Sequence, residues 1–465
     1  MTDVSFILLC NICGILRVTH PKYRIAIVGS GIAGLSAAWL LSRHHEVHLF
    51  EADTRLGGHS NTVTVMTAAG PLAIDTGFIV FNDRTYPNLV PLFDTLGVTS
   101  VKSDMSFSVS SGGGAFEYAG SDIHGLMAQK RNLVRPRFWS MIRDLMRFYR
   151  EAAEDGRHPS AMQQRLGAYL TEKGYGKAFR EDHILPMAAA IWSTGDARID
   201  DFPLAALTRF FDHHGLLNLS DRPQWRTLVG GAKTYVAEMA KPLGRRVHLN
   251  HAVRSIARGP GTVRLTTQDG IADDFDHVVI AAHADQALAM LDDPTEDERN
   301  LLGAFQYSRN RAVLHSDPAL MPRRKAAWAS WNALREKDGA DAPEKVCVSY
   351  WMNRLQPIGR QQDFFVTLNP VHEPDAVHYE TQYTHPLFDS RAMMAQRELW
   401  SLQGGRRTWF CGAHFGYGFH EDGVQSGLAV AEAIGGVTRP WRVPDENGRV
   451  MALAEANTPL RRAAE

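Results

Sequence analysis

The chain is poor in cysteine, in excess charge of one sign and in long apolar runs. Four cysteines in 465 residues are too few for a disulfide framework, so we expect a reducing compartment and predict a cytoplasmic protein. The formal net charge of −1 gives no overall bias toward nucleic acid, and no nucleic-acid partner is expected. No internal repeat or low-complexity segment is visible. With 44% apolar residues, the chain is expected to form about two or three domains around a large core.

The N-terminal apolar stretch, Val4 to Leu16, is too short to span a bilayer, which takes about 20 residues. It also lacks the basic leader of a secretory signal, because Asp3 is the only charge before it. Three interpretations stay open: an interfacial anchor, a loosely docked extension, and residues upstream of the true start. Cys10 and Cys13 have the spacing of a redox or metal pair, but the sequence holds no second pair. We therefore expect no metal site.

A glycine motif between two apolar strands is the strongest feature of the sequence. Residues 25–28 are apolar and lead into Gly29, Gly31 and Gly34, then into a helical pattern and a second apolar strand. The first glycine permits a tight turn, the second lets the backbone approach a pyrophosphate, and the third lets helix and strand pack closely. Glu51 follows the second strand, where an acid accepts hydrogen bonds from a ribose. The motif predicts a dinucleotide site, with the phosphates at the N-terminus of the helix.

The residues after Glu51 indicate which dinucleotide is bound. A second glycine pair, Gly57-Gly58, stands in the run from Arg55 to His59, and an Asp-Thr-Gly-Phe turn follows at residues 75–78. This arrangement resembles the FAD-binding family that includes flavin amine oxidases and phytoene desaturases. His59 occupies the place of an Arg in that family and so departs from the amine oxidase pattern. The resemblance implies FAD, in preference to NAD, as the tightly held cofactor.

Two distant segments resemble the same family, in the same order along the chain. The resemblance implies that the backbone of Val253 bonds the adenine, and that the strand ending at Gly412 closes the FAD site with the segment from 418 to 427. It further implies that an acid there bonds the ribityl or phosphate region, and that a new helix directs its N-terminus at the flavin. Between these segments, residues 262–267 and 275–282 are expected to form a hairpin-like pair. The cofactor-binding residues expected from motif and resemblance are Gly29, Ser30, Gly31, Ile32, Ala33, Gly34, Glu51, Ala52, Arg55, Gly57, Gly58, His59, Thr76, Gly77, Val253, Gly412, Glu421, Asp422, Gly423 and Val424.

The matches predict an α/β fold, with a Rossmann-like FAD-binding domain of the GR2 type and an inserted α+β substrate-binding domain. The expected divisions are residues 1–21 as an N-terminal extension, 22–84 with 225–290 and 400–436 as the FAD-binding domain, 85–224 with 291–399 as the substrate domain, and 437–465 as a C-terminal tail.

Residues 130–154 form the strongest helical pattern of the predicted substrate domain. Apolar residues recur at helical spacing from Phe138 to Tyr149, and basic residues from Lys130 to Arg150 supply another side. Two interpretations stay open. The basic side is either the solvated face of an ordinary helix or a surface that rests on anionic lipid headgroups.

No catalytic triad is visible, and none is expected, because a flavin performs the redox step itself. The candidates for residues beside the flavin are His414, Tyr417 and His420, and Tyr350 lies on a strand-like segment, residues 350–353, that is expected to line the substrate cavity. A histidine there could act as an acid or base near neutral pH, or serve only in a hydrogen bond or in packing.

The leading functional prediction is an FAD-dependent oxidoreductase that oxidises or desaturates an apolar substrate. The whole chain is most similar to a bacterial branch of predicted NAD/FAD-binding proteins associated with fatty-acid modification, which implies a methylated or unsaturated fatty acyl chain. A flavin amine oxidase is the alternative, and a non-redox isomerase or structural flavoprotein is the second. The predicted partners are a small-molecule or lipid substrate and, peripherally, a membrane surface. Electron acceptor and oligomeric state stay open.

Overall fold

The computed structural model describes residues 20–450, except 121, 163, 193–198, 214–216, 218–221, 338–343 and 445. The predictions for the N-terminal apolar stretch, for Cys10 and Cys13, and for the last fifteen residues of the tail lie outside the described residues. Among the described helices, none combines the length and apolar character needed to cross a bilayer.

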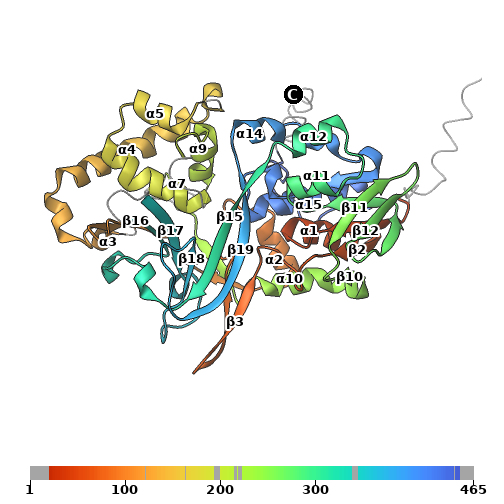
Figure 1. Ribbon diagram of the computed structural model, residues 1–465, viewed down its shortest axis with the longest axis horizontal. Helices are drawn as coiled ribbons and strands as arrows, with labels where there is room; N and C mark the ends of the chain where they lie inside the picture. Colours follow the sequence, from red (N-terminus) through yellow and green to blue (C-terminus); the bar gives the residue numbers. More distant parts are fainter. Residues whose placement is uncertain are drawn as a thin grey trace, which may run out of the picture.

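A five-stranded parallel sheet carries the glycine motif and occupies the right half of Figure 1. Its strands, in spatial order, are β10 (Val247–His248), β2 (Glu46–Phe50), β1 (Arg24–Val28), β14 (His277–Ile280) and β20 (Thr408–Phe410). Strands far apart in the sequence thus lie side by side. The order confirms the Rossmann-like α/β fold that the sequence predicts.

Two helices pack against each other beside this sheet so closely that side chains are excluded between them. They are α1 (Ile32–Leu41), of which every residue is buried, and α15 (His420–Ile434). A Cβ atom on Gly427 would lie 2.2 Å from the carbonyl oxygen of Ala33, and one on Gly34 would lie 2.0 Å from that of Gly29. Glycine is therefore required on both helices by backbone contact. This packing joins the N-terminal and C-terminal parts of the fold.

The expected hairpin between residues 262–267 and 275–282 is wrong. Strand β12 (Val263–Thr267) instead lies between β11 (Val253–Arg258) and β13 (Ala272–Phe275) in an antiparallel sheet, and β14 joins the parallel sheet beside β1. The cause is burial, since three of the four residues of β14 are buried, as suits an inner parallel strand, whereas β13 is largely exposed.

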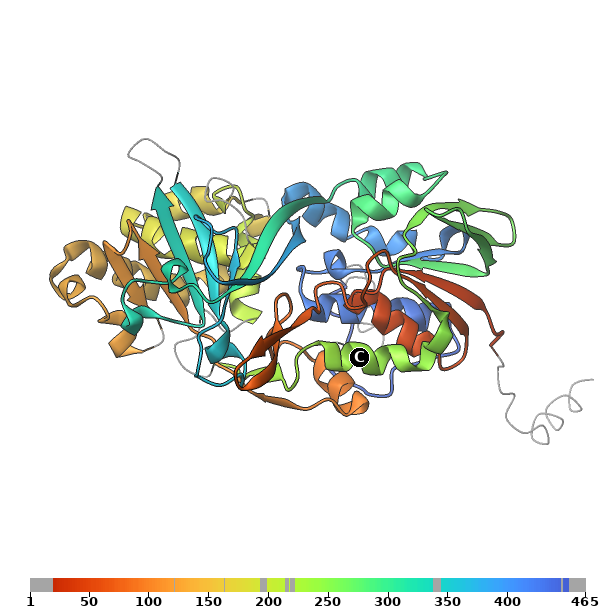
Figure 2. The ribbon, with the colours of Figure 1, turned by 60° about the horizontal axis from the view of Figure 1, so that its bottom comes forward.

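A seven-stranded mixed sheet forms the second large layer. Its strands, in spatial order, are β19 (Val377–Leu387), β15 (Gln306–His315), β18 (Phe365–Leu368), β17 (Glu344–Trp351), β16 (Trp331–Lys337), β7 (Phe107–Ser111) and β8 (Phe116–Ala119). The long strands β15 and β19 run along the middle of the molecule, between the two halves seen in Figure 1. In Figure 2 the yellow helices lie behind the strands of this sheet. They include α4 (Pro136–Asp155), α5 (Leu166–Glu172), α7 (Leu185–Trp192) and α9 (Leu204–His213).

The remaining elements complete the two halves. The small sheets are β3 (Thr62–Thr67) with β4 (Gly70–Asp75), and β5 (Phe81–Asn82) with β9 (Trp225–Leu228) and β6 (Ser100–Lys102). The other α-helices are α2 (Leu89–Leu96), α3 (Ile123–Leu126), α6 (Lys177–Phe179), α10 (Lys233–Ala240), α11 (Ala284–Met290), α12 (Glu296–Leu302), α13 (Met352–Leu355) and α14 (Ser390–Gln396). The domain boundaries given above stay predictions.

Two predicted elements are each divided in the structure. The helix expected over residues 130–154 is divided into a 3₁₀ turn, η1 (Lys130–Val134), and α4, with Arg135 extended between them at φ −94° and ψ 117°. Pro136 is the cause, because a residue before proline is driven out of the helical region. The strand-like segment 350–353 ends at Trp351, where α13 begins.

The contact between α1 and α15 gives a stability prediction. Gly427→Leu would force a side chain into the Ala33 backbone, and we expect the free energy of unfolding to fall by about 3 kcal/mol or more. Denaturant titration measures the change. The control is Gly261→Ala, because a Cβ atom on Gly261 meets nothing within 4 Å. Equal stability of the two variants would contradict the packing described.

Candidate functional site

One cavity, of about 980 Å³, extends from the glycine turns of the parallel sheet to the helices beside the seven-stranded sheet. It is lined by residues from both ends of the chain. The predicted site residues that line it are Gly29, Ser30, Gly31, Ile32, Ala33, Glu51, Ala52, Gly58, His59, Thr76, Gly77, Val253 and Gly412, and the four catalytic candidates His414, Tyr417, His420 and Tyr350. The fold therefore brings most of the predicted site together in one place.

The glycine end of the cavity has open space where a phosphate group would need it. Gly29 turns the chain at φ +99°, which favours glycine, and Gly31 precedes the first turn of α1. A Cβ atom on Gly31 would meet nothing within 4 Å, and one on Gly58 would lie 3.2 Å from the Gly31 Cα atom. The two glycine turns therefore lie against each other, and the open space at Gly31, beside a helix N-terminus that favours negative charge, leaves room for a pyrophosphate.

Glu51 lies at the same end, as the motif predicts. Its carboxylate accepts hydrogen bonds from the backbone N–H of Ser30 at 2.8 Å, from the Ser30 hydroxyl and from the N–H of Asp53 at 2.9 Å. The side chain is thus oriented by the two loops that it joins. Val253, the first residue of β11, lines the cavity together with His251 just before it. The adenine contact is predicted on this strand.

Two buried histidines offer the cavity unused hydrogen-bonding atoms. The Nε2 atoms of His59 and His414 have no hydrogen-bond partner within the part of the chain that the structure describes. A buried polar atom without a partner costs free energy, so a ligand with donors and acceptors along its length fits here. Together with the open space at Gly31, these atoms fit FAD.

The His420 ring is held in place at the start of α15. It stacks on Phe78 with ring centroids 3.7 Å apart and an interplanar angle of 6°. Its Nε2 atom lies 2.9 Å from the Tyr235 hydroxyl and 3.0 Å from the Ser60 hydroxyl, which also bond each other. These contacts fix the ring on one wall of the cavity.

Strand β19 supplies a second wall that sequence reasoning missed. Tyr383 stacks on His59 at 4.8 Å, and its hydroxyl lies 2.8 Å from the Thr76 hydroxyl. His385 lies 5.3 Å from His59, and His283 stacks on Tyr307 at 4.4 Å. The only sequence signal was the density of Tyr and His in residues 377–387.

Burial keeps the cavity histidines neutral. It lowers the pKa of His414 and of His420 to about 3, and that of His385 to about 4. These rings therefore carry no proton to donate as imidazolium near neutral pH. The contacts of these rings are hydrogen bonds and stacking, and a part for them in acid–base chemistry stays a prediction.

Seven predicted cofactor residues do not line the cavity: Gly34, Arg55, Gly57, Glu421, Asp422, Gly423 and Val424. Gly34 and Gly423 pack against neighbouring backbone and side chains, and the N–H of Gly57 donates to the Ser30 carbonyl at 3.1 Å. Arg55 donates to the Gly58 carbonyl at 2.9 Å and so braces the second glycine turn. Val424 is fully buried.

Hydrogen bonds within the chain engage the two acids of α15, for which a ribityl or phosphate contact is predicted. The buried Glu421 carboxylate accepts from Asn88 and from the backbone N–H of Leu89 at 3.0 Å, which anchors the start of α2. The Asp422 carboxylate accepts from the N–H of Tyr417 at 3.0 Å and of Phe419 at 2.7 Å. Glu421 thus holds α2 against α15, and Asp422 shapes the loop before α15.

The far end of the cavity is apolar. It is lined there by Phe107, Tyr118, Leu126, Ile142, Leu145, Met146, Tyr149, Met187, Phe210 and Trp331. Ile142, Leu145, Met146 and Tyr149 come from α4, and Tyr350 closes the cavity from β17. Of the described lining residues, Glu51 is the only acid, and it lies at the glycine end.

Gly31→Trp is expected to yield a chain that purifies without the flavin that the sequence predicts. The indole would fill the open space that the pyrophosphate needs, while meeting no protein atom at its Cβ position. Absorbance of the purified protein measures the flavin, and thermal unfolding shows whether the chain is folded. The matched control is Gly261→Trp, at another open glycine. A fully yellow Gly31→Trp protein would place the cofactor elsewhere.

Asp75, next to the cavity residues Thr76 and Gly77, gives a pH prediction. Burial raises its pKa to about 7, so the folded chain holds a proton that the unfolded chain releases near pH 4. The folded state then binds more protons between these values, and stability falls as the pH rises from about 4 to about 7. Asp75→Asn is expected to remove this part of the pH dependence, measured as the difference in unfolding free energy between wild type and variant. A difference in unfolding free energy that stays constant from about pH 4 to about pH 7 would contradict a raised pKa for Asp75.

Comparison with known proteins places this geometry in a family. Residues 32–315 match the family described as flavin containing amine oxidoreductase. A Mycobacterium tuberculosis protein carrying the name flavin-containing monoamine oxidase AofH is 29% identical over 287 residues, 60% of this chain and 61% of the relative. The chain therefore spans less than two thirds of that relative's length.

Solved structures show the same fold. Cyclohexylamine oxidase from Brevibacterium oxydans IH-35A superposes with a TM-score of 0.64 at 17% identity, over 89% of this chain and 99% of its own. A CLA-producing fatty acid isomerase from P. acnes gives a TM-score of 0.62 at 15% identity, over 90% of this chain and 99% of its own. Because the family match covers more than half of the sequence, the chain belongs to the flavin containing amine oxidoreductase family.

Proposed function

We propose that this enzyme oxidises or desaturates an apolar substrate, such as a methylated or unsaturated fatty acyl chain. The observation that carries the proposal is the apolar far end of the cavity, which α4 and the seven-stranded sheet line with aliphatic and aromatic side chains. Burying an alkyl chain there is favourable by about 0.8 kcal/mol for each CH₂ group.

The distribution of charge supports the same substrate class. A substrate ammonium group would lose its hydration at the far end and meet no carboxylate of the described lining residues, since Glu51 lies at the other end. The cavity instead has Arg222 in its lining, near enough to Tyr149 to act on the pKa of its hydroxyl. A guanidinium beside an apolar channel suits the carboxylate of a fatty acid.

FAD supplies the redox chemistry by accepting a hydride or electrons from the substrate. The chain's own residues bind, orient and exclude water. Phe78 and Tyr235 hold the His420 ring, and Tyr383 stacks on His59 in another part of the lining. These aromatic side chains remove an alkyl chain beside them from water.

A flavin amine oxidase is the second candidate. The family match and the similarity to AofH favour it, and a neutral amine would meet neutral histidines at the aromatic walls. A third candidate, isomerisation of an acyl chain without net oxidation, is suggested by the shared fold of the P. acnes fatty acid isomerase.

Anaerobic titration of the purified holoenzyme separates these candidates. We expect fatty acids or their esters to bleach the flavin absorbance, and polyamines and aromatic amines to leave it oxidised. Bleaching by amines alone would assign amine oxidation instead. Conversion of a fatty acid to an isomer, with the flavin oxidised at the end and no oxidant consumed, would assign the isomerase.

Ile142→Trp tests whether the far end holds the substrate. Ile142 lines the cavity from α4, and the larger side chain would occupy part of it. We expect the variant to keep its flavin and to lose about tenfold or more in kcat/KM with the substrate found above. Met394→Trp, at an exposed apolar position away from the cavity lining, is the control. Unchanged turnover in Ile142→Trp would remove the far end from the substrate site.

A further inference from the structure

Exposed apolar side chains gather on one short part of the chain. Of the eleven large apolar residues that are exposed in the described structure, six lie between positions 123 and 146. They are Ile123, Met127, Leu133, Val134, Trp139 and Met146, and Val134 is 82% exposed. Figures 1 and 2 both place the orange segment that includes α3 and the start of α4 at the end of the molecule opposite the parallel sheet. Exposed apolar side chains concentrated in this way indicate an interaction site.

On α4, basic and apolar residues share the exposed face. Trp139, Arg143, Met146 and Arg150 are spaced by four, three and four residues, so they form one stripe along the helix. All four are exposed, with Trp139 at 52% and the Arg143 side chain at 75%. The indole N–H of Trp139 donates to the Leu133 carbonyl at 2.8 Å, which fixes the indole against η1.

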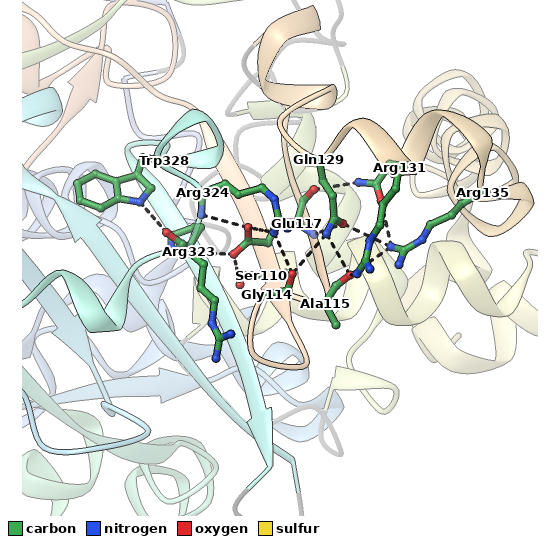
Figure 3. Close-up of polar contacts among 12 residues, drawn as sticks. Ser110, Gly114, Ala115, Glu117, Gln129, Arg131, Arg135, Arg323, Arg324 and Trp328 are labelled. Atoms are coloured by element: carbon green, nitrogen blue, oxygen red, sulfur yellow. Dashed lines mark hydrogen bonds and ion pairs between the residues drawn. The ribbon is translucent and has the colours of Figure 1, made fainter.

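Arginines at the start of this face hold positive charge that no acid neutralises. Figure 3 shows Arg131 and Arg135 converging on the carbonyl of Ala115, at 3.2 Å for Arg135. No carboxylate of the described residues pairs with either guanidinium. The nearby carboxylate of Glu117 is buried and already bonded to Arg324, at 2.7 Å, and to the backbone N–H of Arg323, at 2.6 Å.

The charges of these arginines act on one another. Burial, and after it the charges of Arg131 and Arg324, lower the pKa of the Arg135 guanidinium. Arg137 on the same helix is different, because its guanidinium is paired with Asp182 at 2.7 Å and Glu181 at 2.9 Å. Arg143 is also paired, with the neighbouring Asp144 at 3.3 Å, so the positive charge that lacks a carboxylate partner at the start of this face is that of Arg131 and Arg135.

We propose that the surface formed by α3, η1 and the exposed stripe of α4, here called the docking face, binds the surface of an anionic lipid bilayer. Val134, Leu133 and Trp139 enter the interface between headgroups and acyl chains, and Arg131, Arg135 and Arg143 contact lipid phosphates. Apolar residues flanked by arginines are the arrangement that interfacial helices use, and tryptophan is enriched at this depth. Each basic residue near an anionic surface contributes about 1 kcal/mol.

The docking face is continuous with the substrate cavity. Leu126 and Met146 line the cavity, and Met146 is also 39% exposed on the stripe of α4. An alkyl chain could therefore pass from the bilayer to the flavin without crossing water. This entry route rests on the proposed function, whereas the binding of the face to lipid does not.

Co-sedimentation of the full-length holoenzyme with vesicles tests the proposal without turnover. We expect the protein to sediment with phosphatidylcholine vesicles that contain phosphatidylglycerol, and much less with phosphatidylcholine alone. Replacing Val134 and Trp139 together by glutamate should abolish the binding. Replacing Arg131 and Arg135 together by glutamine should weaken it by about 30-fold, or about 2 kcal/mol.

Matched variants elsewhere on the surface serve as controls. Met66→Glu and Met394→Glu change residues that are 74% and 67% exposed and lie outside the docking face, and Arg245→Gln removes an exposed arginine elsewhere. These variants should bind vesicles like the wild type, and all variants should keep their flavin, which reports correct folding.

Three results would overturn the proposal. They are wild-type protein that ignores anionic vesicles, docking-face variants that bind as well as the controls, and a docking face that instead mediates self-association abolished by Val134→Glu with Trp139→Glu. If vesicles are bound but no fatty acid bleaches the flavin, the docking face stands and the proposed substrate fails. If a fatty acid bleaches the flavin but vesicles are not bound, the proposed substrate stands and the docking face fails.

Discussion

The close backbone contact between α1 and α15 is the constraint on which the site depends. Gly34 and Gly427 leave no room for side chains at the first glycine turn and between the two helices, so the glycine turn at Gly29 and the loop before α15 meet at one cavity. The same contact sets His420 against Phe78 and Ser60, which precede it by more than 300 positions. A binding site built from both ends of a chain exists only as long as this packing holds.

The sequence predicts the parts of the site that local backbone chemistry determines. Gly29, Gly31 and Gly58 occupy positions that the turn geometry and the open space explain, and Glu51 follows β2 as expected. For Glu421 the motif does not show which donors surround the carboxylate, and in the structure the backbone of α2 donates to it. The pairing of β14 was wrongly predicted, because an apolar strand of a hairpin and an inner strand of a parallel sheet have the same sequence pattern.

The second wall of the cavity shows the limit of sequence reasoning most clearly. Tyr383, His385 and His283 come together only because β19 and β15 pair along their whole length across the middle of the molecule. Burial then turns histidines into neutral stacking groups, although their type alone suggests titration near neutral pH. The proposed substrate class likewise rests on where acids are missing, at the apolar end of a cavity whose described acid, Glu51, lies at the other end.

A single cavity joins the predicted FAD site to an apolar end lined by α4. Photo-crosslinking with a fatty acid that carries a diazirine on its alkyl chain, followed by peptide mapping of the holoenzyme, tests this most directly. We predict labelling within residues 142–149 of α4 and on β16 or β17, suppressed by excess unlabelled fatty acid. Labelling confined to the outer surface, or suppression by amines and not by fatty acids, would contradict the account.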